Sequence, residues 1–195
     1  MYETYDIQKK KGKQINVEIK KIQDAQWNQV KAIYMEAFPK AERKPIFLLR
    51  RAARKGKSDL YLALDRETVA GFIAVIPYRD MVMVEYLAVS NQIRSKGTGS
   101  KLLAEVCRRY AKHRILLMIE QIDENADNAE QRIARKRFYL KNGFEPSDFV
   151  ALGVSGPMEV LCFGGQISGD EFVELQKHTL GPLLFRLSRT KIVRN

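Results

Sequence analysis

A strand, a glycine-bearing loop and a helix are predicted to follow one another directly within residues 85–103. The apolar run ends near Val89, and the next loop carries Arg94, Gly97 and Gly99 in an Arg-x-x-Gly-x-Gly pattern. A helix that begins in such a loop directs backbone N–H groups and the positive end of its dipole to one point. Glycine permits unusual backbone dihedral angles and removes the Cβ atoms that hold a phosphate away. We therefore expect an anion site that suits a pyrophosphate.

Two other nucleotide-binding motifs do not fit this loop. A P-loop requires Gly-x-x-x-x-Gly-Lys-Ser/Thr, whereas Gly99 is followed by Ser100 and then Lys101, with no matching upstream glycine. A dinucleotide-binding loop requires a further glycine three residues after Gly99, and that position is Leu102. A tight turn before a helix, with no ligand, is the simpler alternative for the two glycines.

The composition is that of an ordinary globular chain, with 195 residues, 45% hydrophobic and 29% charged. This length fits one domain over residues 1–195. Cys107 and Cys162 are too few for a disulfide framework, and no Cys/His cluster indicates a metal. No apolar run is long enough to span a membrane, and the N-terminus lacks an apolar signal core. We expect a cytoplasmic protein without a membrane partner.

The net charge of +11 is partly local, because seven Lys and Arg residues fall within residues 43–57. A basic surface attracts phosphates of every kind, including those of nucleic acids and of nucleotide cofactors. No nucleic-acid-binding motif accompanies this stretch, so the simpler interpretation is a solvated helix face. We expect no nucleic-acid partner.

The spacing of apolar residues predicts a mixed α/β (α+β) architecture. Strands are predicted over 15–22, 60–65, 69–76, 81–89, 114–122, 149–154 and 158–163, with a turn at 77–80. Helices are predicted over 27–38, 45–55, 102–111 and 131–142, then around 172–178 and after Pro182. The early strands form an antiparallel meander, and strands 81–89 and 114–122 form a parallel pair across a helix. Ligand chemistry is expected at the carboxyl ends of this pair.

Two blocks of sequence resemble the acetyl-CoA-binding signature of the GNAT N-acetyltransferase superfamily. Leu87-Ala88-Val89, Arg94–Ser100 and Leu102-Leu103 match its strand, loop and helix, and Arg137–Phe144 matches its Phe-Tyr-x-x-x-Gly-Phe segment. The resemblance implies the GNAT-like acyl-CoA N-acyltransferase fold over roughly 15–163, with an extension over 164–195. It also implies that the central parallel strands splay apart and admit the pantetheine arm of acetyl-CoA, the acetyl donor.

The resemblance assigns cofactor contacts to the first block. The residues are Leu87, Ala88, Val89, Arg94, Ser95, Lys96, Gly97, Thr98, Gly99 and Ser100. The backbone N–H of Val89 is expected to polarise the thioester carbonyl, and Lys101 is a candidate contact to the adenosine phosphate. Family members often carry an Asn seven residues before the tyrosine, whereas that position here is Arg132, so this contact is not implied.

Direct transfer in a ternary complex needs a neutral amine, a stabilised oxyanion and a protonated thiolate. Glu85 is the candidate base, because strand alternation puts its side chain on the same face as that of Val89. A salt bridge to one of the many arginines is its structural alternative, and Glu120 is the second candidate base. Tyr139 is the candidate acid, and aromatic packing on the sheet is its structural alternative.

The acceptor is expected to be a primary amine on a small molecule. A protein α-amino or lysine group is the second hypothesis, and a non-catalytic CoA sensor or nucleic-acid-binding module of the same fold is the third. The tail over 166–195 has three alternatives: packing on the core, a homodimer contact, or a cover over the acceptor site.

Overall fold

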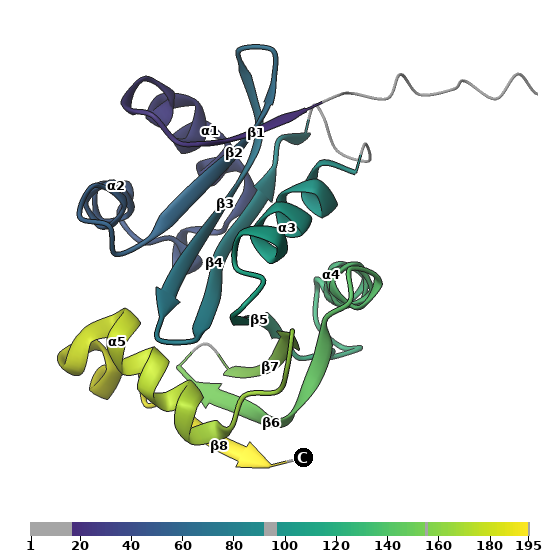
Figure 1. Ribbon diagram of the computed structural model, residues 1–195. Helices are drawn as coiled ribbons and strands as arrows, with labels where there is room; N and C mark the ends of the chain where they lie inside the picture. Colours follow the sequence, from purple (N-terminus) through teal and green to yellow (C-terminus); the bar gives the residue numbers. More distant parts are fainter. Residues whose placement is uncertain (1–16, 92–96, 155, 195) are drawn as a thin grey trace, which may run out of the picture.

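The computed structural model describes residues 17–91, 97–154 and 156–194 (Figure 1). The strands are β1 (Glu18–Lys21), β2 (Asp59–Asp65), β3 (Thr68–Tyr78), β4 (Met81–Val89), β5 (Arg114–Glu120), β6 (Glu145–Gly153), β7 (Gly156–Phe163) and β8 (Lys191–Arg194). The helices are α1 (Trp27–Ala37), α2 (Ile46–Arg54), α3 (Thr98–Arg109), α4 (Ala129–Lys141) and α5 (Gly169–Ser188). The strands form one sheet in the order β1-β2-β3-β4-β5-β7-β6-β8.

The sheet is mixed, as predicted. β1 to β4 form an antiparallel meander. β4 and β5 are parallel and are connected through α3. The strands from β5 through β7 and β6 to β8 are again antiparallel. The mixed α/β fold class with a parallel central pair is therefore confirmed.

The central pair splays apart. β4 and β5 are in register from Met81 opposite Arg114 to Met83 opposite Leu116. β4 then continues to Val89, and β5 continues to Glu120, without further register between them. The two strands diverge in Figure 1, with α3 and α4 lying beside the opening. The splay that the family resemblance implied is confirmed.

The helices form two layers around the sheet. α3 and α4 cover one face, where Leu102 of α3 is fully buried. α1 and α2 cover the β1–β4 half of the other face, and Tyr34 packs there on Phe72 of β3. α5 covers the remaining half through Phe172, which shares a cluster with Ile76 of β3. Because Phe72 and Ile76 are separated by an even number of residues, α1, α2 and α5 lie on the same face.

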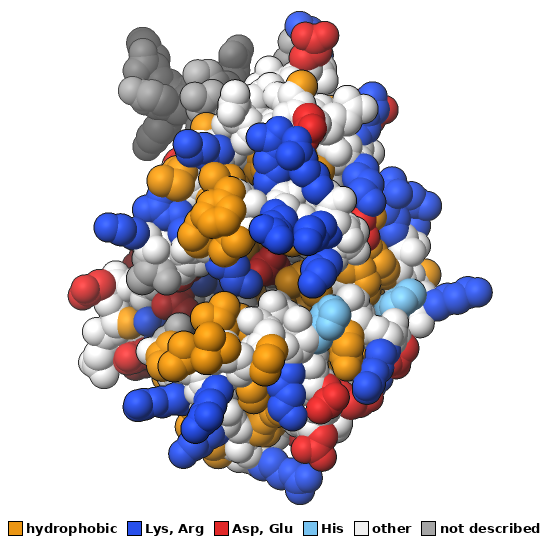
Figure 2. All heavy atoms as spheres, turned by 90° about the vertical axis from the view of Figure 1, so that its left-hand side faces the viewer, with side chains coloured by type: hydrophobic (Ala, Val, Ile, Leu, Met, Phe, Trp, Pro, Cys, Tyr) orange, Lys and Arg blue, Asp and Glu red, His pale blue; other side chains and the backbone are white. Residues whose placement is uncertain are grey.

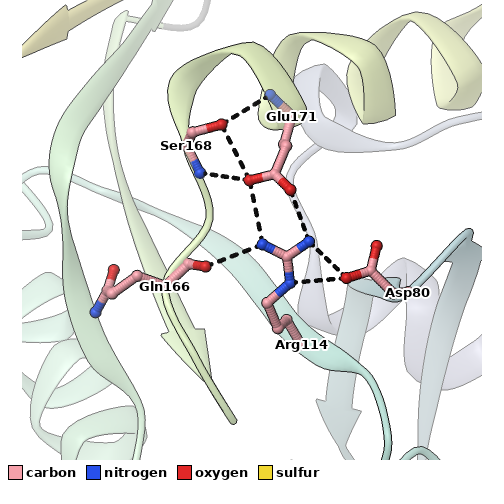
Figure 3. A network of polar contacts seen from close by, with 5 residues as sticks. All are labelled: Asp80, Arg114, Gln166, Ser168 and Glu171. Carbon is pink, nitrogen blue, oxygen red and sulfur yellow. Dashed lines mark hydrogen bonds and ion pairs between the residues drawn. The ribbon is translucent and has the colours of Figure 1, made fainter.

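The C-terminal tail packs on the core, which was one of the three alternatives. Arg114 at the start of β5 fastens α5, since its Nη2 atom lies 2.7 Å from Glu171 Oε1 and 2.6 Å from Asp80 Oδ2 (Figure 3). Gln176 of α5 lies across the central pair, with its amide nitrogen 3.5 Å from the sulfur of Met83 and 3.6 Å from that of Met118.

A kink separates two parts of α5, in agreement with the two predicted helices. Gly181 has φ +74° there, and Pro182 follows it. Two other sequence predictions were incomplete. The turn predicted at 77–80 is shorter, because β3 continues through Tyr78 and Arg79 takes φ +54° in a tight connection. β8 was missed, because basic residues at both of its ends obscure a strand pattern.

The helices within the described ranges were compared with the length and apolarity that a bilayer span requires. None of them meets both requirements.

Candidate functional site

The N-terminus of α3 lies beside the opening between β4 and β5. Gly97 precedes the helix in a left-handed conformation with φ +74°, which favours glycine. Thr98 begins the helix, and its hydroxyl is buried without a hydrogen-bond partner among the described residues. A buried polar atom of this kind is costly unless a ligand or water completes it. The helix start therefore fits a polar ligand with hydrogen-bond acceptors, such as a phosphate.

The unusual backbone dihedral angle predicted for Gly99 is absent, while its contact with the coenzyme stays a prediction. Its backbone is helical, so no unusual dihedral angle requires glycine there. A Cβ atom at Gly99 would lie 3.2 Å from the ring of Phe138 in α4. The missing side chain allows α3 and α4 to approach closely. Ser100 lies in the same first turn, whereas the predicted contacts Arg94, Ser95 and Lys96 lie outside the described residues.

The peptide group between Ala88 and Val89 is oriented towards the opening. A Cβ atom at Gly71 of β3 would lie 2.7 Å from the carbonyl oxygen of Ala88, so this carbonyl points to β3. The N–H of Val89 belongs to the same planar group and points the opposite way. Consistently, the next amide, that of Ser90, donates to Ala70 on the β3 side at 2.9 Å. The N–H of Val89 is thus directed into the opening, where a carbonyl oxygen can accept from it.

β4 carries one extra residue at Glu85. Along β3, Ala74 is opposite Tyr86 while Val75 is opposite Val84, so Glu85 has no position of its own in this register. This is a β-bulge, which interrupts the alternation of side chains between the two faces. Val84 accordingly packs with the α3 side of the core, and Tyr86 packs with the α1 side.

The bulge overturns the prediction that Glu85 and Val89 share a face. Val89 lies on the side of α3, since its side chain is 3.8 Å from a Cβ atom at Gly99. Glu85 instead turns to the side of α1 and α2, where it meets Lys44. The α3 side of β4, where the coenzyme contacts are predicted, and the candidate base are thus on opposite faces of the strand.

Glu85 forms an ion pair with Lys44. Lys44 Nζ lies 2.5 Å from Glu85 Oε1, and the side chains are 37% and 12% exposed, respectively. A salt bridge, the structural alternative for Glu85, is therefore present, but its partner among the described residues is a lysine and not the expected arginine. Figure 2 shows a hollow on this face of the molecule, with acidic side chains inside it and Lys and Arg side chains along its rim.

Glu120 is the last residue of β5, on the other strand that borders the opening, and it has several partners. Its carboxylate lies 3.2 Å from Arg132 Nη2 and 3.0 Å from Arg135 Nη1. The side-chain amide of Asn128 donates to both of its oxygens at 3.3 Å. Arg132, which replaces the family's asparagine, also donates to the Asn128 side chain at 2.7 Å. This network ties the loop before α4 to β5.

Glu42 extends the acidic character of the opening from the α1 and α2 side. Burial raises the pKa of this carboxyl above its ordinary value, while Arg135 lowers it and Glu120 raises it further. A pocket of about 470 Å³ lies next to this region, with Glu120, Asp123, Arg132 and Pro157 in its wall. Its size is within the range of small-molecule sites.

Tyr139 is the residue of α4 that is buried in the core. It is 9% exposed, and its ring lies 5.2 Å from that of Phe138 and 5.9 Å from that of Phe144. Burial raises the pKa of its phenol to about 12. The aromatic packing that was the structural alternative is present, and the role of Tyr139 as an acid stays a prediction. Burial also raises the pKa of the Cys107 thiol to about 11, so this thiol is protonated at neutral pH.

Sequence reasoning missed three residues that shape the site. Lys44 was one of many basic residues, and only the fold brings it to Glu85. Tyr34, which holds the backbone of Lys44, was assigned only to the apolar face of a helix. Gly71 had a usable signal, because a glycine inside an apolar strand often marks the close approach of another backbone.

Comparison with known proteins gives one family and consistent structural relatives. The family model "Acetyltransferase (GNAT) domain" matches residues 56–146. The protein YjbC of Bacillus subtilis (strain 168), named as an acetyltransferase, is 28% identical over 136 residues, which cover 66% of this chain and 67% of YjbC. The matched segment of the family model includes both candidate bases, Tyr139 and the glycine loop.

Solved structures share the fold. A GNAT-family protein of Bacteroides thetaiotaomicron superposes with a TM-score of 0.65 and 21% identity, over 86% of this chain and 98% of its own. NAA60 of Arabidopsis thaliana, solved in complex with acetyl-CoA, gives 0.61 and 14%, over 76% and 98%.

Proposed function

Because the chain belongs to the GNAT superfamily of acetyltransferases, we propose that it transfers the acetyl group of acetyl-CoA directly to the primary amine of a small molecule. The observation that carries the proposal is the opening between β4 and β5, into which the N–H of Val89 points. A backbone donor aimed at a developing oxyanion is a strong source of transition-state stabilisation. The complex of NAA60 with acetyl-CoA supports the choice of donor.

The first turn of α3 is the proposed binding site for the diphosphate of acetyl-CoA. Gly97 opens this turn, and the buried hydroxyl of Thr98 offers a further polar contact. Acetyl-CoA supplies an activated thioester, and the chain's own groups orient it. Because β4 and β5 separate after Met83, the opening leaves room for an extended arm between two strands.

Glu85 is the proposed base. Its carboxylate already holds the ammonium of Lys44, so it is a site at which an amine is bound and can lose a proton. Tyr139 is the proposed proton donor to the departing thiolate, and its raised pKa keeps the phenol protonated. The protonated Cys107 thiol is a poor nucleophile, which supports direct transfer without an acyl-enzyme.

The pocket beside Glu120 supports a small-molecule acceptor. Its volume of about 470 Å³ suits a small-molecule ligand. Its wall contains the carboxylates of Glu120 and Asp123 and the guanidinium of Arg132. The basic stretch at 43–57 gives less support for an acidic acceptor than its charge indicated. Lys44 is engaged with Glu85, and Arg50 and Arg54 both contact Asp24.

The experiment is a panel of amines assayed for release of the CoA thiol, after a thermal-shift measurement with acetyl-CoA. Acetyl-CoA at a hundredfold excess over Kd should raise the unfolding free energy by about 2.7 kcal/mol. A matched pair of variants tests the oxyanion donor. Val89→Ala keeps the N–H and should retain most activity, whereas Val89→Pro removes it and should lower kcat by about 10²-fold or more.

Val89→Pro removes no bond to β3, because this N–H points away from that strand. Its melting temperature and circular dichroism show whether the fold is kept. Failure of acetyl-CoA to stabilise the wild-type chain would refute the proposal, as would equal kcat values in the two folded variants.

A further inference from the structure

Lys44 presents a primary amine to the proposed base. Its ammonium lies 2.5 Å from Glu85 Oε1, where an external acceptor amine would also have to give up its proton. Glu85 is at the bulge, two residues after the last position at which β4 and β5 are in register. The lysine therefore reaches the start of the opening from the side of α1 and α2.

The backbone of Lys44 is held in place by buried tyrosines. The N–H of Lys44 donates to the hydroxyl of Tyr34 at 2.8 Å, and this hydroxyl donates to the carbonyl of Lys44 at 3.2 Å. The hydroxyl of Tyr86 donates to the carbonyl of Glu42 at 3.2 Å. Tyr34 is 1% exposed and Tyr86 is 7% exposed, so the segment is anchored to the core. A fixed backbone with a flexible four-carbon side chain gives the amine a limited range around Glu85.

We propose that Lys44 is an internal acceptor and that the protein acetylates its own Lys44 side chain. This inference rests on the proposed function, because the acetyl group comes from bound acetyl-CoA. The amine and the base belong to the same chain and are already in contact, so the transfer is unimolecular once acetyl-CoA is bound.

The reaction balances without another reagent. The Lys44 ammonium gives one proton to Glu85, and the neutral amine swings from the carboxylate to attack the thioester carbonyl carbon. An N–C bond forms, the C–S bond breaks, and the second proton lost by nitrogen goes to the departing thiolate. The products are N-acetyl-lysine and free CoA, and Glu85 returns its proton to water.

Acetylation removes the positive charge that Lys44 contributes. A neutral amide cannot pair with Glu85 as the ammonium does, so the carboxylate loses its lysine partner. The carboxylate is only 12% exposed, and an unpaired charge at such a site favours another cation. Self-acetylation would thus exchange an internal amine for an external one at the base.

The test uses the full-length chain with acetyl-CoA alone, followed by peptide mass spectrometry. We expect acetylation of Lys44 at least tenfold faster than acetylation of the exposed Lys40 and Lys55, which serve as matched lysines in the same part of the chain. The first-order rate constant for Lys44 acetylation should be independent of protein concentration, since the acceptor belongs to the same molecule. Glu85→Gln should slow it at least tenfold.

Lys44→Arg is the companion variant. It keeps a cation opposite Glu85 and cannot be acetylated, so total incorporation should fall by the Lys44 share while the melting temperature stays near that of the wild type. Similar rates at all three lysines would indicate uncatalysed acetylation and overturn the proposal. A rate that rises with protein concentration would also overturn it, because the acceptor would then be another molecule.

Thermal shift with acetyl-CoA separates this proposal from the proposed function. Stabilisation by acetyl-CoA, or turnover of an external amine, together with an unmodified Lys44 refutes the internal acceptor alone. No stabilisation and no turnover refute both.

Discussion

Glu85 on β4 and Glu120 on β5 belong to the two strands that border the opening in the sheet, and their surroundings differ. Among the described residues, Glu85 is paired with one lysine, Lys44, whose side chain is 37% exposed. Glu120 on β5 is held by Arg132, Arg135 and the amide of Asn128. An acid–base group must exchange its partner in every cycle, whereas a structural carboxylate keeps its partners. The comparison therefore favours Glu85 as the base and gives Glu120 the task of fixing the loop before α4.

The largest effect is expected where the comparison assigns chemistry. Glu85→Gln should lower kcat by about 10²-fold or more, because general base catalysis contributes on this scale. Stabilisation by acetyl-CoA should stay nearly unchanged, since the α3 loop is on the other face of β4. Steady-state kinetics and thermal shift measure the two effects separately. Wild-type turnover in Glu85→Gln would show that Glu85 is not the base.

A smaller effect, of a different kind, is expected at the second carboxylate. Glu120→Gln leaves Arg132 and Arg135 without their carboxylate partner and should lower the unfolding free energy by about 2 kcal/mol. Because Glu120 acts through structure, kcat should change only a few-fold. Chemical denaturation measures the first quantity, with the exposed Glu124→Gln as the matched control. A loss of kcat as large as that of Glu85→Gln would reverse the two roles.

The smallest effect is expected at a third carboxylate, that of Glu171, whose role is structural. Arg114 and the capping Ser168 lower the pKa of Glu171 to about 2. A lowered pKa means that the stabilisation is complete above the ordinary value of 4.5 and is lost as the pH falls towards 2. Because the side chain is 39% exposed, solvent screening limits the effect to about 1 kcal/mol or less.

Glu171→Gln should accordingly melt below the wild type at pH 7, and the difference should disappear between pH 4.5 and pH 2. Thermal unfolding across this range measures it. A difference that persists at pH 2 would mean that the glutamine disturbs α5 itself rather than removing a charge.

Much of the fold followed from the periodicity of apolar residues. β4 begins and ends where the alternating pattern predicted, and α2 buries Leu49 as its spacing required. The glycine loop and the Phe-Tyr block led to the family, and the coenzyme contacts that they imply stay predictions. These features are encoded over a few neighbouring residues, so a single sequence is sufficient to find them.

The acceptor side was less predictable, because its geometry depends on distant segments. The bulge at Glu85 is visible only as a shift of register against β3, and it moves the carboxylate to the other face. The partners of Glu85 and Glu120 come from positions 41 and 15 residues away, respectively, for Lys44 and Arg135. No periodic pattern encodes such a pairing. β8 was missed for a related reason, since its strand character comes from its pairing with β6.

The short register between β4 and β5 divides the sheet into two halves, β1–β4 and β5–β8. Among the described residues, β4 pairs with β5 from Met81 to Met83. α5 also connects the two halves, because Gln176 contacts Met83 of β4 and Met118 of β5. We expect a molecule bound between β4 and β5 to change the angle between the two halves of the sheet. β6 and β8, at the edge of the second half, should therefore respond to the bound coenzyme without contacting it. Slower amide hydrogen exchange in these two strands would show this response.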